Sequence, residues 1–118
     1  MASVCGAHAQ KVVVYECLES YYGEQTFPND IGRKMYMSFS KDKCVEWAVR
    51  PDGTYYEPDE YPLLTVLDNG TRVYQYRAPG SMISTTYEVS RDKSRITRIK
   101  ASDNLPNAGI ITYRKISK

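Results

Sequence analysis

Three groups of side chains in this sequence could take part in chemistry: a histidine, a few cysteines and a short acidic run. They are His8; Cys5, Cys17 and Cys44; and Glu57, Asp59 and Glu60. A nucleophile needs a neighbouring base, and a metal site needs several donors at suitable spacing. The chemistry open to this chain therefore depends on where these residues lie and which of them stay in the mature protein.

The first ten residues, MASVCGAHAQ, do not match a strand pattern. Ala7-His8-Ala9 fits the small-x-small site that signal peptidase recognises. We interpret residues 1–9 as the remnant of a secretory signal peptide whose charged and apolar parts lie upstream of Met1. Residues 10–118 then form a single domain, secreted or exported to the periplasm. A cytosolic protein with a frayed start, or a leftover of an expression vector, is the alternative.

Cleavage after Ala9 would remove His8 and Cys5, leaving no imidazole and two thiols. A Ser-His or Cys-His nucleophilic pair and a His-bearing zinc site are then excluded. An even pair of cysteines in an exported chain predicts a disulfide between Cys17 and Cys44. This bond would stabilise the fold by about 3 kcal/mol in the chain-entropy model. Two buried, reduced thiols that pack as small hydrophobes are the alternative.

The acidic run could supply an acid and a base for glycoside cleavage, or oxygen ligands for calcium. The spacing of Glu57, Asp59 and Glu60 matches no calcium-binding loop, so a solvated acidic turn is favoured. The sequence also contains no glycine-rich phosphate loop and no dinucleotide fingerprint. We therefore expect a protein that is not an enzyme and that holds no cofactor or metal.

Residues 33–50, RKMYMSFSKDKCVEWAVR, contain two runs in which apolar residues alternate with others. A period of two is typical of half-buried strands, and the polar residues 41–43 separate the runs, so the stretch predicts a β-hairpin. The predicted core face combines this hairpin with a later strand: Met35, Met37, Phe39, Val45, Trp47, Val49, Ile83 and Val89.

Similar patterns predict further strands at residues 11–18, 63–67, 71–77, 83–89, 95–101 and 110–116. Asp68-Asn69-Gly70 predicts a hairpin with a type I′ turn. Residues 20–32 are expected to form a long connection, and two prolines should keep residues 58–62 out of a central strand. FSKDKC at residues 39–44 is echoed by VSRDKS at residues 89–94, where each Asp can accept bonds from turn amides.

These elements predict an all-β fold: a small antiparallel barrel or a two-sheet sandwich of seven to eight strands, built from consecutive hairpins. The sequence contains no run of about 20 apolar residues, which is the length that a membrane-spanning helix needs. In a simple meander Cys17 and Cys44 would lie at opposite ends of the sheet, whereas a disulfide needs Cα atoms within about 7 Å. The disulfide therefore requires residues 19–32 to cross the sheet, which they are long enough to do.

The chain has 11 tyrosines against 2 phenylalanines, which suits strands that are covered on one face only. Five tyrosines lie in or next to predicted loops, and they form the candidate ligand site together with the single tryptophan: Tyr21, Tyr22, Tyr55, Tyr56, Tyr61 and Trp47. Aromatic faces at loops can stack on sugars or anchor a protein, so we expect an exported binding module for a protein or glycan.

Two other interpretations stay open. The tyrosine rings could cap the ends of the barrel instead of binding a ligand. Alternatively, a small barrel could enclose an apolar small molecule, with Met35, Met37 and Trp47 lining the cavity.

Charge is distributed unevenly: residues 1–60 carry 6 Lys/Arg and 10 Asp/Glu, and residues 61–118 carry 10 and 4. The basic residues of the second half are spread singly along the predicted strands, which is typical of solvated strand faces. Nucleic-acid binding is not expected.

Overall fold

The computed structural model describes residues 11–116, without the side chains of residues 105–108. The described residues form nine antiparallel strands and one turn of 3-10 helix, η1. In chain order these elements are β1 (Val13–Tyr22), β2 (Gln25–Thr26), η1 (Pro28–Asp30), β3 (Lys34–Phe39), β4 (Lys43–Trp47), β5 (Asp59–Val66), β6 (Arg72–Arg77), β7 (Ile83–Val89), β8 (Arg95–Ser102) and β9 (Leu105–Lys115).

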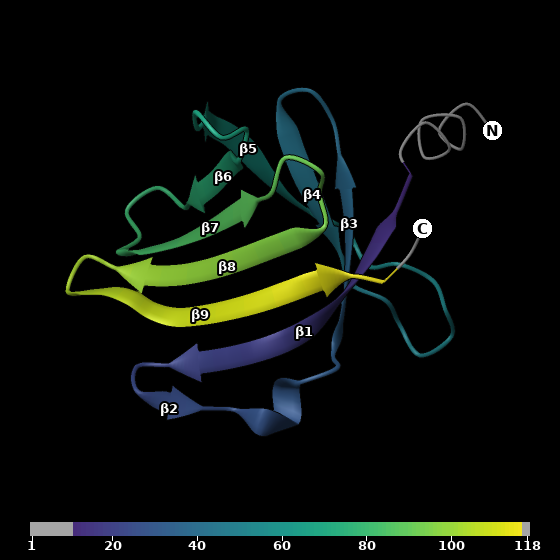
Figure 1. Cartoon of the computed structure of the whole chain (residues 1–118), viewed down its shortest axis with the longest axis horizontal. Helices are drawn as coiled ribbons and strands as arrows, with labels where there is room; N and C mark the ends of the chain where they lie inside the picture. Colours follow the sequence, from purple (N-terminus) through teal and green to yellow (C-terminus); the bar gives the residue numbers. More distant parts are fainter. Residues whose placement is uncertain (1–10, 117–118) are drawn as a thin grey trace.

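Eight of these strands close into a barrel. Each strand from β3 to β9 pairs with the next, and β1 pairs with both β3 and β9. β2 is an extra short strand on the end of β1. Figure 1 shows β9 lying between β8 and β1, where the first and last strands of the barrel meet. The prediction of an all-β fold from consecutive hairpins is confirmed, and the barrel is correct rather than the sandwich.

β1 is longer than predicted and continues to Tyr22. A bulge between Cys17 and Glu19 shifts the register of β1 against β9. After β2 and η1 the chain returns to β1 at Cys17. The Cys17 amide donates to the carbonyl of Arg33, and the Gly32 amide donates to the carbonyl of Cys17, both at 2.8 Å. The connection therefore does not cross the sheet.

Large side chains fill the centre of the barrel, and three of the largest are tyrosines. Tyr15, Tyr74, Tyr87, Met37, Ile96 and Val89 are fully buried there. Met35 is also in the core, and Phe39 packs against it. The core positions predicted for Met35, Met37, Phe39 and Val89 are therefore correct.

The face of β4 that points into the barrel is not the one predicted. The turn after β3 has only Lys41 and Asp42 between paired residues, because the Ser40 amide donates to the Lys43 carbonyl at 2.9 Å and Phe39 pairs with Cys44. A break of three residues would have placed Phe39 opposite Val45. A one-residue change in register exchanges the two faces of a strand. Cys44 and Glu46 therefore face inward, while Val45 and Trp47 lie on the opposite face of β4. Val45 is nevertheless buried there, with 3% of its surface exposed, so its predicted burial is correct.

Trp47 is held on this outer face by two contacts. Its Nε1 donates to Oγ of Ser38 at 3.0 Å, and its ring packs against Tyr55 with centroids 5.2 Å apart. Val49 and Ile83 are also outside the core, because both are exposed near the ends of their pairings.

The predicted Cys17–Cys44 disulfide is absent, and both cysteines are buried free thiols. β3 lies between β1 and β4, which separates the two strands by about 9 to 10 Å. Cys17 is beside Arg33, before β3 begins, and Cys44 pairs with Phe39 at its end. The thiols thus lie two strands apart and at opposite ends, too far for a bond.

Two local expectations are also corrected. Residues 59–62 belong to β5, where Pro62 pairs with Lys43 at the start of β4. Proline has no amide hydrogen, and the amide of the next residue, Leu63, donates to the Asp42 carbonyl. Asp68-Asn69-Gly70 does form a hairpin turn, but only Gly70 has a positive φ, of 88°. The turn is therefore a three-residue loop closed by glycine and not a type I′ turn.

Candidate binding site at the open end of the barrel

One end of the barrel is hollowed by two adjoining cavities, and we call this end the mouth. The first cavity, of about 260 Å³, is lined by Ser20, Tyr21, Tyr22, Phe27, Asp30, Arg98, Lys100, Gly109 and Ile111. The second, of about 490 Å³, is lined by Pro58, Asp59, Glu60, Tyr61, Tyr76, Thr85, Arg98 and Lys100. Arg98 and Lys100 line both cavities, so the cavities meet at these two side chains.

The β8 register places Arg98 and Lys100 at the mouth. Ile96, Arg98 and Lys100 occupy alternate positions of β8 and share its inner face. Ile96 is fully buried in the core, and Lys100 is exposed. The inner face of this strand therefore changes from apolar to cationic as it leaves the core.

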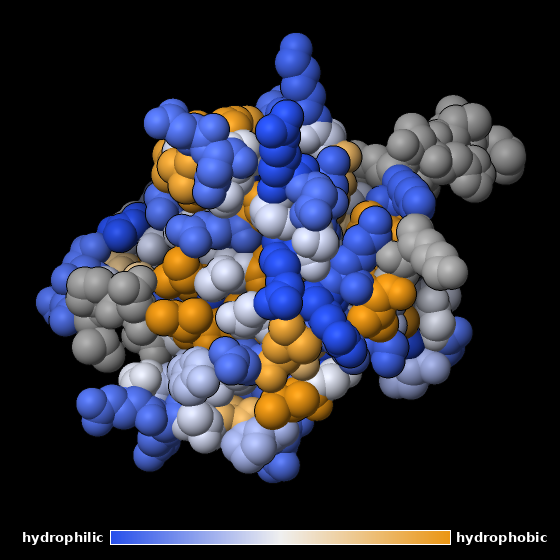
Figure 2. All heavy atoms as spheres, in the orientation of Figure 1, coloured by the Kyte–Doolittle hydropathy of each residue, from blue (hydrophilic) through white to orange (hydrophobic). Residues whose placement is uncertain are grey.

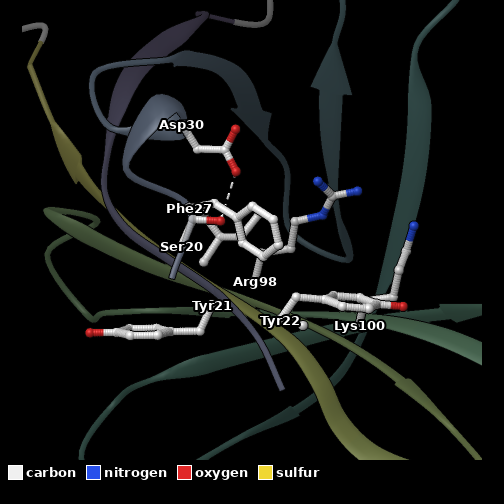
Figure 3. Close-up of a pocket in the computed structure, with 9 residues that line it drawn as sticks. Ser20, Tyr21, Tyr22, Phe27, Asp30, Arg98 and Lys100 are labelled. Carbon is white, nitrogen blue, oxygen red and sulfur yellow. Dashed lines mark hydrogen bonds between the residues drawn. The ribbon is translucent and has the colours of Figure 1, made fainter. Parts of the chain in front are cut away.

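The aromatic wall of the first cavity comes from the end of β1 and from the residues that follow it. The Phe27 amide donates to the carbonyl of Ser20 at 2.8 Å, and Oγ of Ser20 donates to Asp30 of η1 at the same distance. Figure 3 shows Phe27 standing above the β1 backbone, with Tyr21 and Tyr22 pointing in opposite directions. The fold of residues 20–30 thus fixes an aromatic ring over the cavity.

Gly109 of β9 makes room for one of these rings. Gly109 pairs with Tyr22, and a Cβ atom added to Gly109 would lie 3.2 Å from Cδ1 of Tyr22. An aromatic ring that covers a glycine on the neighbouring strand is a recurrent device in antiparallel sheets. Tyr22 is nevertheless 58% exposed, so most of its side chain is open to a ligand.

A polar layer separates the mouth from the core. The phenol of Tyr87 donates to Oε1 of Glu46 at 2.5 Å, and the ring of Tyr61 contacts that of Tyr87 edge-on at 4.8 Å between centroids. Burial, with the charge of Glu46 adding to it, raises the pKa of Tyr61 to about 12. These phenols are therefore neutral near pH 7.

Arg98 lies against this layer, with its guanidinium carbon 5.9 Å from the centroid of the Tyr87 ring. Burial by itself lowers the pKa of Arg98, but Tyr87 and Glu46 raise it above its ordinary value, so the side chain stays charged. Its buried Nε atom has no hydrogen-bond partner within residues 11–116. Arg98 is thus a charged, half-buried group with one donor, Nε, that no described residue satisfies.

Two acids near the mouth already have partners. Asp30 accepts the bond from Ser20 and lies 3.7 Å from Arg33, and Glu60 forms a 2.9 Å salt bridge with Lys43. The part of the chain that the structure describes contains no group of three or more His, Cys, Asp or Glu side chains placed to hold a metal ion. Of the acidic run, Asp59 and Glu60 border the second cavity and Glu57 is exposed.

The structure divides the six predicted ligand residues between two places. Tyr21 and Tyr22 line the first cavity and Tyr61 lines the second. Trp47, Tyr55 and Tyr56 lie away from the mouth, around the β4–β5 connection, and we call them the outer aromatic cluster. Arg50 belongs to the same connection and lies 4.4 Å from the centroid of the Tyr56 ring.

Sequence reasoning missed Ser20, Phe27, Arg98 and Lys100 as site residues. The spacing of Arg98 and Lys100 placed them on one strand face, but Ile99 and Ala101 made the opposite face the more apolar one. Only the pairing of Ile96 with Val89 and Tyr113 decides which face points inward.

Neither a protein-family model, nor a curated protein, nor a solved structure matches this chain. Its class is defined by the fold and the site: an eight-stranded antiparallel barrel with a tyrosine-rich core and a hollowed mouth. Between residues 11 and 116, the structure contains no helix long and apolar enough to cross a membrane.

Proposed function

We propose that this chain is a non-enzymatic binding module that takes a small ligand at the mouth of the barrel. The observation that supports this most directly is the pair of cavities that meet at Arg98 and Lys100. Ligand sites are typically concave, with mostly apolar walls and a few convergent polar groups, and the mouths of barrels are a common place for them. Phe27, Tyr22 and Ile111 would supply the apolar walls here.

The alternative of a carrier that encloses an apolar molecule has less support. Met35 and Met37 pack in the filled core, and Trp47 lies on the outer face. An eight-stranded barrel has an interior just wide enough for its own side chains or for one small ligand. Because Tyr15, Tyr74 and Tyr87 occupy that interior, a ligand at the mouth is the better proposal.

A second candidate site is the outer aromatic cluster, where a glycan or a protein could bind. Tyr55 is 41% and Tyr56 48% exposed, and aromatic faces of this kind can stack on sugars. Figure 2 shows that apolar side chains on the face in view form several separate groups and not one continuous patch. The face in view therefore offers no broad apolar surface to a partner.

Export to the periplasm or secretion is also part of the proposal. It is motivated by Ala7-His8-Ala9 alone, because the free thiols of Cys17 and Cys44 give it no support, and residues 1–10 lie outside the described part of the chain. Intact-mass measurement of protein made with its native leader would test it. We expect a mature chain that starts at Gln10, whereas a cytosolic protein that keeps residues 1–9 would contradict export.

The ligand site can be tested by a fragment screen monitored by amide chemical shifts. Binding at the mouth should shift the amides of Tyr22, Phe27, Arg98 and Lys100, and Phe27→Ala should abolish these shifts. The matched control is Tyr56→Ala, which removes an exposed ring of the outer aromatic cluster. If Tyr56→Ala abolishes binding and Phe27→Ala does not, the ligand site is the outer aromatic cluster; if no fragment shifts a mouth amide, the proposed function is wrong.

A further inference from the structure

More cations than acids line the first cavity. Arg98 and Lys100 both line it, and in Figure 3 their side chains extend in the same general direction from β8. Asp30 is the acid that borders this cavity, and it is already engaged by Ser20 and Arg33. Within the described residues, neither Arg98 nor Lys100 forms a salt bridge.

Three further acids lie near Arg98 or Lys100 but do not line the first cavity. Glu46 lies in the polar layer below and accepts the bond from Tyr87, and Glu60 is paired with Lys43. Asp59 borders the second cavity and not the first. An anion in the first cavity would therefore meet two cations and one partnered acid, with the charge of Glu46 acting on Arg98 from the layer below.

The position of Arg98 also favours an oxygen ligand. Its Nε atom is buried and unpartnered in the described structure, and an unsatisfied buried donor is unfavourable. The guanidinium lies near the Tyr87 ring and forms no salt bridge within the described residues, although the charge of Glu46 also acts on it. A planar guanidinium matches the geometry of a carboxylate, to which it can donate two parallel bonds.

The walls and size of the cavity define the rest of the ligand. Phe27 and Tyr22 present exposed ring faces, and Ile111 adds an aliphatic side chain. The volume of about 260 Å³ is below the range of about 300 to 1,000 Å³ that is usual for drug-sized ligands. The cavity therefore suits a small ligand with one flat apolar body.

We propose that the first cavity binds a small aromatic carboxylate, with its carboxylate on Arg98 and Lys100 and its ring against Phe27 and Tyr22. This inference rests on the proposed function, because it specifies the ligand class of the same site.

Calorimetric titration of the full chain with three naphthalene probes of similar shape tests the charge requirement. The probes are 2-naphthoate, neutral 2-naphthamide and cationic 2-naphthylmethylammonium. We expect 2-naphthoate to bind about tenfold or more tightly than 2-naphthamide at low salt, and to lose affinity as the salt concentration rises. The cation should show the weakest binding of the three.

Two variants assign the effect to the cavity. Lys100→Met removes an exposed charge and should weaken 2-naphthoate by about threefold or more while leaving 2-naphthamide unchanged. Lys41→Met, in the β3–β4 turn, is the matched control and should change neither. Arg98→Met should abolish the preference for the anion; if its circular dichroism shows that it does not fold, Arg98→Lys replaces it and should reduce the preference.

The outcomes separate this inference from the proposed function. Equal affinities for 2-naphthoate and 2-naphthamide, both lost in Phe27→Ala, would overturn the carboxylate inference and leave a ligand site at the mouth. Binding of 2-naphthoate that neither Phe27→Ala nor Lys100→Met affects would place the probe elsewhere and also overturn the inference. If none of the probes binds and no fragment shifts a mouth amide, both proposals fail.

Discussion

Tyr87 of β7 donates a 2.5 Å hydrogen bond to Glu46 of β4 across the inside of the barrel. The two residues are 41 positions apart in the sequence, and β5 and β6 lie between their strands in the sheet. Tyr87 is fully buried, and burial together with the charge of Glu46 raises its pKa. The bond therefore ties opposite parts of the barrel together at the level where the core gives way to the mouth.

Tyr87→Phe should lower the free energy of unfolding by about 1 to 3 kcal/mol, because the half-buried Glu46 carboxylate loses its donor while the ring is kept. Urea unfolding followed by the fluorescence of Trp47 would measure the loss. Tyr55→Phe, which removes a hydroxyl from an exposed ring, is the control and should have little effect. An unchanged midpoint for Tyr87→Phe would contradict a stabilising role for this bond.

Stability should fall at alkaline pH because the barrel buries several phenols. Burial raises the pKa of Tyr15, Tyr74, Tyr87 and Tyr113, and it raises that of Tyr61 to about 12. In the unfolded chain these phenols ionise near pH 10, so unfolding releases protons above that pH. The stabilisation is fully present below about pH 10 and decreases as the pH rises towards about 12.

Urea midpoints measured at a series of pH values between about 8 and 11 would test this expectation. Tyr61→Phe should flatten the decrease, since one phenol with a raised pKa is then missing from the folded state. A midpoint that stays constant up to about pH 11 would show that the phenols ionise as easily in the folded chain as in the unfolded one.

Cys17 and Cys44 should resist alkylation in the native protein and should be insensitive to reductant. Both thiols are buried; burial and the charge of Glu46 raise the pKa of Cys44 to about 12, and burial also raises that of Cys17. Since the thiolate is the reactive form, neither cysteine should react near neutral pH. Mass spectrometry of a Cys5→Ser variant, treated with iodoacetamide before and after unfolding, would count the labelled thiols.

In that variant we expect no label on the folded chain and a label on both cysteines after unfolding, with the same thermal midpoint with and without reductant. A thermal midpoint that drops under reduction would contradict the free thiols and support a Cys17–Cys44 disulfide.

Asp92 should stabilise the β7–β8 turn through three contacts to one of its oxygens. Oγ of Ser90, the amide of Ser94 and Oγ of Ser94 donate to Oδ1 at 2.9, 3.0 and 2.7 Å. These bonds lower the pKa of Asp92 to about 2. The stabilisation is therefore present above the ordinary Asp pKa of about 4 and is lost as the pH falls towards about 2.

Asp92→Ala should lower the thermal midpoint at neutral pH, and the difference from the parent should shrink as the pH approaches about 2. The matched control is Asp42→Ala in the echoed turn, where Oγ of Ser40 lies at a longer 3.4 Å and Cys44 takes the place of Ser94. Equal effects of the two substitutions would show that the contacts to Asp92 add nothing to the turn.

The fold class could be predicted from the sequence because strand periodicity and turn chemistry are local. Met35, Met37 and Val89 were assigned to the core from alternation alone, and the hairpin at Asp68-Asn69-Gly70 from its turn residues. Each of these features depends on a few consecutive residues, so it could be predicted without knowing the tertiary contacts.

The candidate site could not be predicted in the same way. Tyr21, Tyr22 and Tyr61 were selected because aromatic rings near loops are conspicuous, and they line the two cavities. The same argument selected Tyr55 and Tyr56, which do not. Ser20, Phe27 and Arg98 come together only because β1 and β8 both pair with β9. A sequence pattern does not specify pairing between strands this far apart.

The sequence by itself determined that the chain is made of consecutive antiparallel hairpins, since alternation and turn residues act over short distances. Tertiary structure decided which face of each strand points inward, because one residue in the β3–β4 turn places Glu46 inside the barrel and Trp47 outside it. Tertiary structure also kept Cys17 and Cys44 apart, since β3 is inserted between their strands. The physical reason is that side chains alternate along a strand with a period of two, so register and closure, which depend on distant contacts, fix what each residue faces.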